Sequence, residues 1–273
     1  MSEISNARIL ITGGASGIGR LMAEKALAMG AASVMIWDSD EESLSATLDS
    51  LKGKGLSAEG CCIDITETGA LVRLAERTVT EWGTPDILVN NAGTVVGKYF
   101  EEHSHEEVER TLRVNTLSMM HLTKALLPGM MAAGKGHIVN IASSAGMAAC
   151  PRLSVYVASK WAVIGWSESL RLELEERDTG IRVTTVTPYL ISTGMFEGAA
   201  SSVIPILKPE AVASRILKDV RSNRIFSRMP GLVYAMPFFH GILPQRWFDR
   251  IVGRWFGIHG MMRDFRGRSQ MRG

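Results

Sequence analysis

Cysteine is scarce in this chain of 273 residues, and its placement excludes two classes of small stabilised domain. The three cysteines are Cys61, Cys62 and Cys150, and two of them are adjacent. This spacing matches neither a disulfide framework nor the ligand set of a zinc site. We therefore expect no metal and a reducing, cytoplasmic setting, with Cys61 and Cys62 as small buried residues of a strand.

Long hydrophobic runs are also missing. Residues 1–8 are short and polar, without the charged and apolar regions of a signal peptide. No apolar run reaches the roughly 18 uncharged residues needed to cross a bilayer. The sequence therefore predicts a protein that is neither secreted nor membrane-spanning.

The small net charge of +2 hides an uneven distribution. Residues 221–273 carry ten Arg and two Asp, a balance of +8, which leaves −6 for residues 1–220. An acidic body followed by a basic tail indicates that the tail has a separate role.

Apolar runs alternate with segments of helical periodicity from the start of the chain. Uniform βαβα order with buried strands predicts a single α/β domain with a doubly wound parallel sheet of Rossmann type. Helices are expected at 17–29 and 41–51, and strands at 8–12, 33–37, 57–63, 86–89, 136–142, 181–187 and 224–228.

A glycine-rich turn joins the first expected strand to the first helix. It reads Thr-Gly-Gly-Ala-Ser-Gly-Ile-Gly, in which Gly13, Ser16, Gly17, Ile18 and Gly19 are the candidate contacts. Glycines let a backbone approach a pyrophosphate, and a helix N-terminus directs its free N–H groups at it. The turn therefore predicts a dinucleotide site, with an ordinary structural turn as the alternative.

Asp38 closes the second expected strand, nineteen residues after Gly19. A carboxylate there accepts hydrogen bonds from the adenosine ribose and repels a 2′-phosphate. Neither Ser16 nor Ser39, at the neighbouring positions, is basic. NAD is therefore favoured over NADP, while a solvated strand-end aspartate is the plainer interpretation.

Two further strand ends supply candidate cofactor contacts. Asp64 and Ile65 follow the third expected strand and are assigned to the adenine, and Asn91 and Gly93 belong to the turn Asn-Asn-Ala-Gly after the fourth. Carboxyl ends of parallel strands face the ligand crevice. Asparagines are also common turn formers, so this turn alone decides nothing.

Tyr156 and Lys160 are four residues apart at the start of an expected helix, and Ser143 follows the fifth strand. Side chains at i and i+4 share a helix face. A nearby ammonium would lower the pKa of the phenol from about 10 and make Tyr156 a usable acid/base. Ser143 could then hold a substrate oxygen beside that phenol.

Together these motifs resemble the short-chain dehydrogenase/reductase superfamily over roughly residues 7–200. The resemblance implies that Tyr156 is the general acid/base, that Lys160 assists it and binds the nicotinamide ribose, and that Ser143 orients the substrate oxygen. Asn115, in the motif Arg-Val-Asn-Thr, would support a proton relay through water, or be structural. The resemblance assigns the cofactor's nicotinamide side to Tyr156, Lys160, Pro188, Ile191 and Thr193.

A finer resemblance is to the branch that contains retinol and hydroxysteroid dehydrogenases, which act on bulky lipophilic alcohols. Tyr189 stands where the superfamily usually has glycine after the proline. The expected walls of an apolar substrate pocket are Ser143, Met147, Tyr189, Met195 and Phe196, with the loop beyond Gly194 as a lid.

The basic tail contains aromatic residues at helical spacing. One stripe is predicted to comprise Leu243, Trp247, Phe248, Ile251, Val252, Trp255 and Phe256, with Arg246, Arg250 and Arg254 beside it. Such a stripe packs on the body or a partner subunit and covers the substrate site, which we favour, or it attaches peripherally to a membrane. Nucleic-acid binding is disfavoured because no recognition motif accompanies the charge.

We therefore predict an NAD-dependent oxidoreductase of hydrophobic alcohols, whose catalytic domain is residues 1–220. Residues 221–273 add the last strand and a helical extension to the same domain. The alternatives are a reductase of small diketones or xenobiotic ketones, and a non-catalytic NAD-sensing protein. The family resemblance implies a homodimer or homotetramer.

Overall fold

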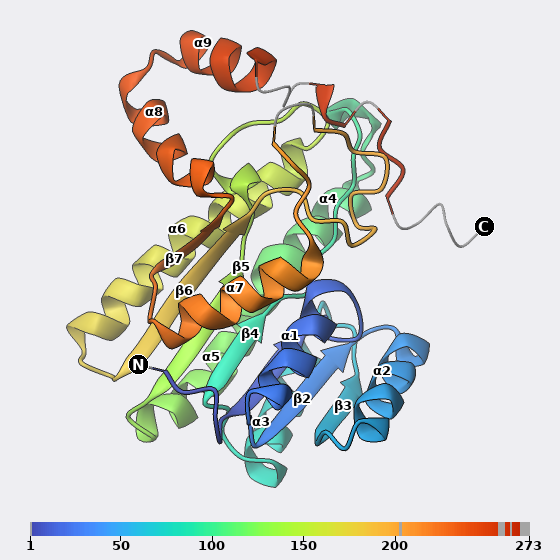
Figure 1. The fold of residues 1–273 in the computed structure, drawn as a ribbon, viewed down its shortest axis with the longest axis vertical. Coiled ribbons are helices and arrows are strands. Elements are labelled where there is room, and N and C mark those ends of the chain that lie inside the picture. The colour runs from blue at the N-terminus through green and yellow to red at the C-terminus, as the bar shows by residue number, and fades with distance from the viewer. Residues whose placement is uncertain (1, 202–203, 256–259, 263, 268–273) are drawn as a thin grey trace.

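A seven-stranded parallel sheet forms the centre of the molecule in the computed structural model, which describes residues 2–201, 204–255, 260–262 and 264–267 (Figure 1). The strand order is β3-β2-β1-β4-β5-β6-β7, so the chain winds outward from β1 in both directions. The strands are β1 (Arg8–Thr12), β2 (Ser33–Asp38), β3 (Ala58–Cys62), β4 (Ile87–Asn90), β5 (Gly136–Ile141), β6 (Ile181–Pro188) and β7 (Phe226–Met229). This is the doubly wound sheet predicted from the alternating pattern.

Helices cover both faces of the sheet. One face carries α1 (Gly17–Ala28), α2 (Glu41–Gly53) and α7 (Pro209–Arg221), and the other carries α3 (Thr68–Glu81), α5 (Ser118–Ala132) and α6 (Ser154–Glu176). The helix α4 (His105–Leu112) continues through a π-helical turn, Arg113–Leu117, into α5. Each face has its own hydrophobic core, because the central strands are buried on both sides.

The two adjacent cysteines correct one expectation. Cys61 is only half-buried and Cys62 is exposed, because β3 is an edge strand with one neighbour, β2. Periodicity in a short segment does not reveal whether a strand lies at the centre or at the edge of a sheet.

The C-terminal extension corrects a second expectation, that of one continuous aromatic stripe. The predicted single stripe is broken at Pro244, with α8 (Met236–Ile242) before it and α9 (Gln245–Phe248) after it. Leu243 is extended, as expected for a residue that precedes proline. Trp247 is 58% exposed while Phe248 is 3% exposed, since neighbours on a helix point in different directions. Phe256 and the side chains of Val252, Arg254 and Trp255 lie outside the description.

Short helical turns complete the fold at Phe100–Glu102, Ser144–Gly146, Gly231–Ala235 and Asp249–Trp255. Within the described part of the chain, no helix is both long enough and apolar enough to cross a membrane.

His137, on β5, is a buried imidazole on the sheet that should make stability depend on pH. Its ring nitrogens lie 2.8 Å from Ser2 Oγ and 2.7 Å from Thr184 Oγ1. Burial, with a smaller effect of Arg182, lowers the pKa of His137 to about 4. The unfolded chain binds this proton below about pH 6.5 and the folded chain does not, so stability is lost as pH falls from about 6.5 to 4.

Each pKa unit corresponds to about 1.4 kcal/mol, so the shift at His137 should lower the free energy of unfolding by about 3 kcal/mol across this window. Urea unfolding between pH 7 and 4 of the wild type and His137→Gln measures it. The variant should be less stable at pH 7, and its deficit should shrink toward pH 4. An equal deficit at every pH would contradict this account of His137.

Candidate active site

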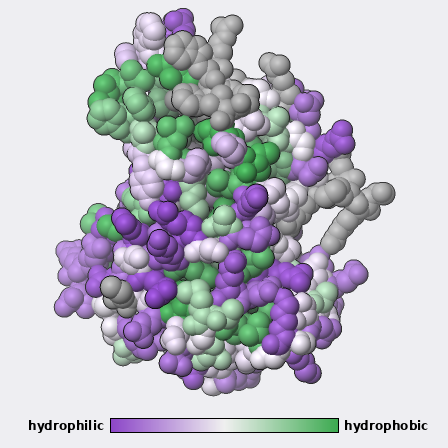
Figure 2. All heavy atoms as spheres, viewed as in Figure 1, coloured by the Kyte–Doolittle hydropathy of each residue, from purple (hydrophilic) through white to green (hydrophobic). Residues whose placement is uncertain are grey.

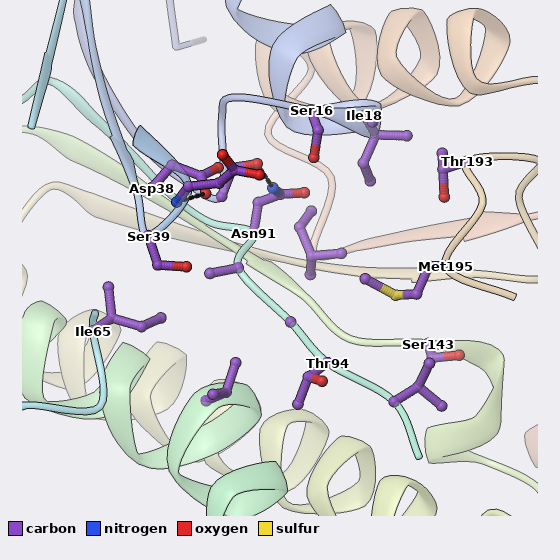
Figure 3. Close-up of a pocket in the computed structure, with 18 of the residues that line it drawn as sticks. Ser16, Ile18, Asp38, Ser39, Ile65, Asn91, Thr94, Ser143, Thr193 and Met195 are labelled. Atoms are coloured by element: carbon purple, nitrogen blue, oxygen red, sulfur yellow. Dashed lines mark hydrogen bonds between the residues drawn. The ribbon is translucent and has the colours of Figure 1, made fainter. Parts of the chain in front are cut away.

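A cavity of about 900 Å³ opens at the carboxyl ends of the strands. It is lined by the turns after β1, β2, β3, β4, β5 and β6 and by the start of α6. Figure 3 shows Asp38 and Ser39 at one end, Ser143 and Met195 at the other, and Asn91 between them. The strand order reverses between β1 and β4, where ligands bind in open α/β sheets.

The glycine turn between β1 and α1 fits a dinucleotide because it leaves no room for side chains. Gly13 has φ +64°, and a Cβ on it would lie 2.8 Å from Ala92 Cα. A Cβ on Gly19 would overlap the carbonyl oxygen of Gly13. Ser16, Gly17 and Ile18 line the cavity, so the N-terminus of α1 faces it. A pyrophosphate could therefore approach the backbone there.

Asn91 holds this turn in place. Its Nδ2 donates to the carbonyl oxygens of Gly13, at 2.8 Å, and Thr12, at 2.9 Å. Thr12 Oγ1 in turn accepts from the backbone N–H groups of Asn91 and Ala92. The turn after β4 thereby sets the shape of the turn after β1.

Asp38 lies at the end of β2 with both carboxylate oxygens directed at backbone. Oδ2 accepts from Ala15 N at 3.0 Å, and Oδ1 accepts from Asp40 N at 3.1 Å. A carboxylate has about four lone-pair sites, so each oxygen can still accept from a ribose hydroxyl.

The lining around Asp38 is acidic. Asp40, Glu41 and Asp64 also line the cavity, while Arg110 is the basic residue of the lining at this end. Arg110 Nη2 lies 3.3 Å from Asp64 Oδ2. Burial acts to raise the pKa of Asp64, but hydrogen bonds from Thr66 and the charge of Arg110 outweigh it and hold that pKa below its ordinary value.

The other end of the cavity contains the tyrosine and the serine. Ser143 follows β5 and its Oγ accepts from Ala145 N at 3.1 Å. Tyr156, in the first turn of α6, is 4% exposed, and the Ser143 side chain acts to lower the pKa of its phenol. The phenol and the hydroxyl therefore line the same end of the cavity.

The structure does not show Lys160 lowering the pKa of the phenol. Burial raises the pKa of Tyr156 to about 12, against a smaller opposite effect of Ser143. Burial also lowers the pKa of Lys160 to about 8. The Lys160 Nζ lies 5.7 Å from the centroid of the Tyr156 ring and donates to the Ile141 carbonyl at 2.9 Å. Removal from water therefore outweighs the attraction between the two groups.

Asn115 lies behind the cavity rather than in its lining. It occupies the π-helical turn, where its Nδ2 donates to Thr94 O and Ser159 Oγ and its Oδ1 accepts from Thr94 N. This side chain joins the loop after β4 to α6. In this structure the Asn115 side chain therefore has the structural role that was the alternative to a proton relay.

The remaining predicted residues also divide into those that line the cavity and those that do not. Met147 is half-buried but is not in the cavity lining, because it follows the turn Ser144–Gly146. Gly19 is buried behind the lining. The others line the cavity: Gly13, Ser16, Gly17, Ile18, Asp38, Asp64, Ile65, Asn91, Gly93, Ser143, Tyr156, Lys160, Pro188, Tyr189, Ile191, Thr193, Met195 and Phe196.

Several lining residues were missed by the sequence analysis. Trp37 carried no signal beyond its place in a buried strand, and Arg110 and Val114 come from a helix that we had not delimited. Thr94, Val95 and Val96 directly follow the turn Asn-Asn-Ala-Gly, so their position after the fourth strand could have identified them.

Comparison with known proteins assigns the family. The family model described as short chain dehydrogenase matches residues 7–203. The chain therefore belongs to the short-chain dehydrogenase family and is an oxidoreductase of a family that uses NAD or NADP. Over 273 residues it is 34% identical to epidermal retinol dehydrogenase 2 of Mus musculus, covering 98% of this chain and 88% of the relative. Over 263 residues it is 32% identical to estradiol 17-beta-dehydrogenase 11 of Pongo abelii, covering 92% and 87%.

Solved structures share the fold. A short-chain dehydrogenase/reductase from Burkholderia phymatum in complex with NAD is 25% identical, covers 93% of this chain and 97% of its own, and has a TM-score of 0.80. A metagenomic short-chain oxidoreductase in complex with NADP is 29% identical, covers 83% and 96%, and has a TM-score of 0.70. The chain is thus similar to structures that bind each of the two cofactors.

Proposed function

We propose that this protein is an NAD-dependent dehydrogenase that interconverts a hydrophobic alcohol and its carbonyl compound. The observation that carries the proposal is the arrangement along one cavity. Ser143 and Tyr156 line its apolar end, and the glycine turn and Asp38 lie at the other.

The cofactor would be held along the length of the cavity. Asp38 would accept from the adenosine ribose hydroxyls, and Gly13, Ser16, Gly17 and Ile18 would contact the pyrophosphate. Asp64 and Ile65 lie near the adenine end, and Pro188, Ile191 and Thr193 lie toward the nicotinamide. When bound, NAD supplies the carbon that accepts a hydride from the alcohol.

The protein's own residues would handle the proton. Ser143 Oγ would hold the substrate oxygen, and the Tyr156 phenolate would take the proton from the alcohol O–H. In the reverse direction the phenol would return it to the carbonyl oxygen. Lys160, held by the Ile141 carbonyl, would favour the phenolate when charged. We assign Asn115 a positioning role, through its bonds to Thr94 and Ser159.

A hydrophobic substrate suits the chemistry of the wall beside Tyr156. Tyr189, Met195 and Phe196 line this end, and the Phe196 ring lies edge-on to Tyr156 with centroids 5.7 Å apart. The relatives named for retinol and estradiol support a bulky apolar alcohol as the substrate class. Met147, outside the lining, is not part of this proposal.

A panel of alcohols, from short chains to retinoids and steroids, tests the substrate class by the rate of NADH formation. We expect kcat/KM to be highest for the large apolar alcohols. Turnover confined to small alcohols or diketones would favour the small-ketone reductase instead. Tight NADH binding without turnover of any alcohol would favour a non-catalytic NAD sensor.

We also propose that residues 221–273 form one domain with residues 1–220. The strand β7 pairs with β6 and completes the sheet. The buried Met261 and Met262 pack in one cluster with Tyr156. Calorimetry should therefore record a single unfolding transition.

Self-association as a homodimer or homotetramer is a further proposal. It is supported by the family, whose members commonly oligomerise. Exposed leucines also support it, such as Leu117 in the π-helical turn before α5 and Leu172 on α6. Light scattering in solution measures the mass. A monomeric mass at assay concentration would contradict it.

We further propose a cytoplasmic protein that contacts membranes peripherally through α8 and α9. Figure 2 shows hydrophobic side chains gathered over α8. Phe238 is 65% exposed, Ile242 is 63% exposed, and Trp247 lies next to the exposed Arg246. Arg250 stacks on Trp247, 5.7 Å from its ring centroid. Exposed aromatics beside arginines suit an anionic lipid interface.

Co-sedimentation with anionic and neutral vesicles tests the membrane contact. Burial of each large apolar side chain contributes roughly 1.5–3 kcal/mol, so Phe238→Ala with Trp247→Ala should weaken binding by about 10² or more. Phe100→Ala, at an equally exposed phenylalanine far from α8 in the chain, is the matched control. Equal sedimentation of all three proteins would refute the contact.

A further inference from the structure

The last described residues lie on the loop that follows β6. Residues 260–262 and 264–267, here the C-terminal clasp, run beside residues 194–201, here the lid loop (Figure 1). Ala200 N donates to Met261 O at 3.0 Å, and Arg266 N donates to Glu197 O at 2.8 Å. Two backbone hydrogen bonds, far apart along the clasp, therefore hold it to the lid loop.

The clasp packs too closely for side chains at two glycines. Gly198 has φ +82°, and a Cβ on it would overlap the carbonyl oxygen of Asp264. A Cβ on Gly97, in the loop after β4, would overlap the ring of Phe265. The clasp thus fits against the two loops on either side of the apolar end of the cavity.

Two side chains outside the clasp anchor it. Tyr189 OH lies 3.1 Å from Ser201 Oγ and 3.5 Å from Met261 Sδ. Arg152 Nη1 donates to Met262 O at 3.3 Å. Tyr189 stands where the superfamily usually has glycine. This anchor therefore depends on a side chain that the usual superfamily sequence lacks.

A chain of three aromatic rings links the clasp to the catalytic end. The Phe265 ring lies 6.4 Å from Phe196 and the Phe196 ring lies 5.7 Å from Tyr156, both edge-on. Phe196 lines the cavity, whereas Phe265 lies behind it. Within this row of three rings, Phe265 therefore contacts the cavity lining only through Phe196.

We propose that Phe265 is a positioning residue for substrate selectivity: it holds Phe196 against Tyr156 and so maintains an apolar wall that favours bulky apolar alcohols. This rests on the proposed dehydrogenase function. Removal of the ring at residue 265 frees Phe196 to turn away, so a large substrate loses its apolar contact. A small alcohol does not reach this wall, and Phe265 lies behind the cavity lining, where it would not contact the cofactor.

The test compares Phe265→Ala, the conservative Phe265→Leu and a matched control, Phe100→Ala, at an exposed phenylalanine outside the cavity lining. For each protein we would measure kcat and KM with a bulky apolar alcohol and a small one, the NADH Kd, and amide hydrogen exchange of the lid loop. If Phe265→Ala does not fold, Gly97→Ala, whose methyl displaces the same ring, takes its place.

We expect Phe265→Ala to lower the ratio of kcat/KM for the bulky over the small alcohol about 10-fold, mainly through KM. Phe265→Leu should restore most of this ratio, Phe100→Ala should match wild type, and the NADH Kd should stay unchanged. Exchange of the lid loop should be faster in Phe265→Ala. A ratio equal to that of the control overturns the proposal, even if Phe265→Ala is less stable.

The failure of the proposed function gives a different result. If wild type turns over neither alcohol, the dehydrogenase assignment fails, and hydrogen exchange in the NADH-bound protein decides on the clasp. Faster exchange of the lid loop in Phe265→Ala than in Phe100→Ala supports Phe265 as its anchor, and equal exchange overturns it.

Discussion

Tyr156→Phe should lower kcat for alcohol oxidation by about 10²- to 10⁴-fold, the usual contribution of a positioned acid/base. The variant removes the phenolic oxygen and keeps the ring that packs against Phe196. The NADH Kd should change far less than kcat, because Tyr156 is one of many residues around the cofactor.

Steady-state NADH formation and NADH titration measure both effects of Tyr156→Phe. Tyr99→Phe is the matched control, because Tyr99 is an exposed tyrosine and does not line the cavity. A kcat for Tyr156→Phe within a few fold of wild type would show that another group moves the proton.

The pH dependence of the same assay follows from the burial of Tyr156. Burial raises the pKa of this phenol to about 12, so the phenolate that accepts the alcohol proton is the minor form at neutral pH. Oxidation should therefore accelerate as pH rises, and Tyr156→Phe should lose this dependence. A flat profile for wild type would contradict the role of the phenolate as base.

Asp38→Asn should shift the cofactor preference toward NADP. A carboxylate and a phosphate charge about 4 Å apart repel by about 4 kcal/mol at an effective dielectric constant near 20, so the NADPH-to-NADH affinity ratio should rise by about 10²- to 10³-fold. The amide oxygen can still accept from Ala15 N, which preserves the turn after β1.

Fluorescence titration with NADH and NADPH measures this ratio. Asp49→Asn is the matched control, since it removes the same charge from the exposed surface of α2. Equal ratios in the two variants would mean that Asp38 does not set the preference. The acidic Asp40 and Glu41 nearby would then be the next residues to replace.

The predicted sheet was confirmed because its signals are local. Buried parallel strands are short apolar runs with a turn at each end, so the strand at 8–12 was delimited correctly and that at 181–187 was one residue short. The edge position of β3 was not predictable in the same way. It depends on pairing with β2 alone, and Cys62 is exposed for that reason.

Spacing also explains how much of the cavity lining the sequence could predict. Gly13, Asp38, Ser143 and Tyr156 all follow or face the carboxyl ends of strands, and a parallel sheet brings those ends to one edge. Arg110 lies on a helix at the rim of the cavity and forms an ion pair with Asp64. No local sequence pattern predicts this ion pair.

Two further features depend on packing between distant segments. The pKa values of Tyr156 and Lys160 are governed by burial, which the i, i+4 spacing does not reveal. The contact of Phe265 with Phe196 joins residues 69 positions apart, and the tail showed only a periodic aromatic pattern. Pro244 separates Leu243 from the rest of the predicted stripe, and Trp247 is exposed whereas Phe248 is buried, because neighbouring side chains on a helix point in different directions.

Transfer of deuterium from a bulky apolar alcohol to NAD⁺ is the decisive measurement of the proposed hydride transfer and of the role of Tyr156. The alcohol is labelled at its carbinol carbon, and the reduced cofactor is analysed by mass spectrometry after incubation with wild type or Tyr156→Phe. The account predicts singly deuterated NADH from wild type, formed about 10²-fold or more slowly by the variant. Unlabelled NADH, no NADH, or equal labelled product from both proteins would contradict it.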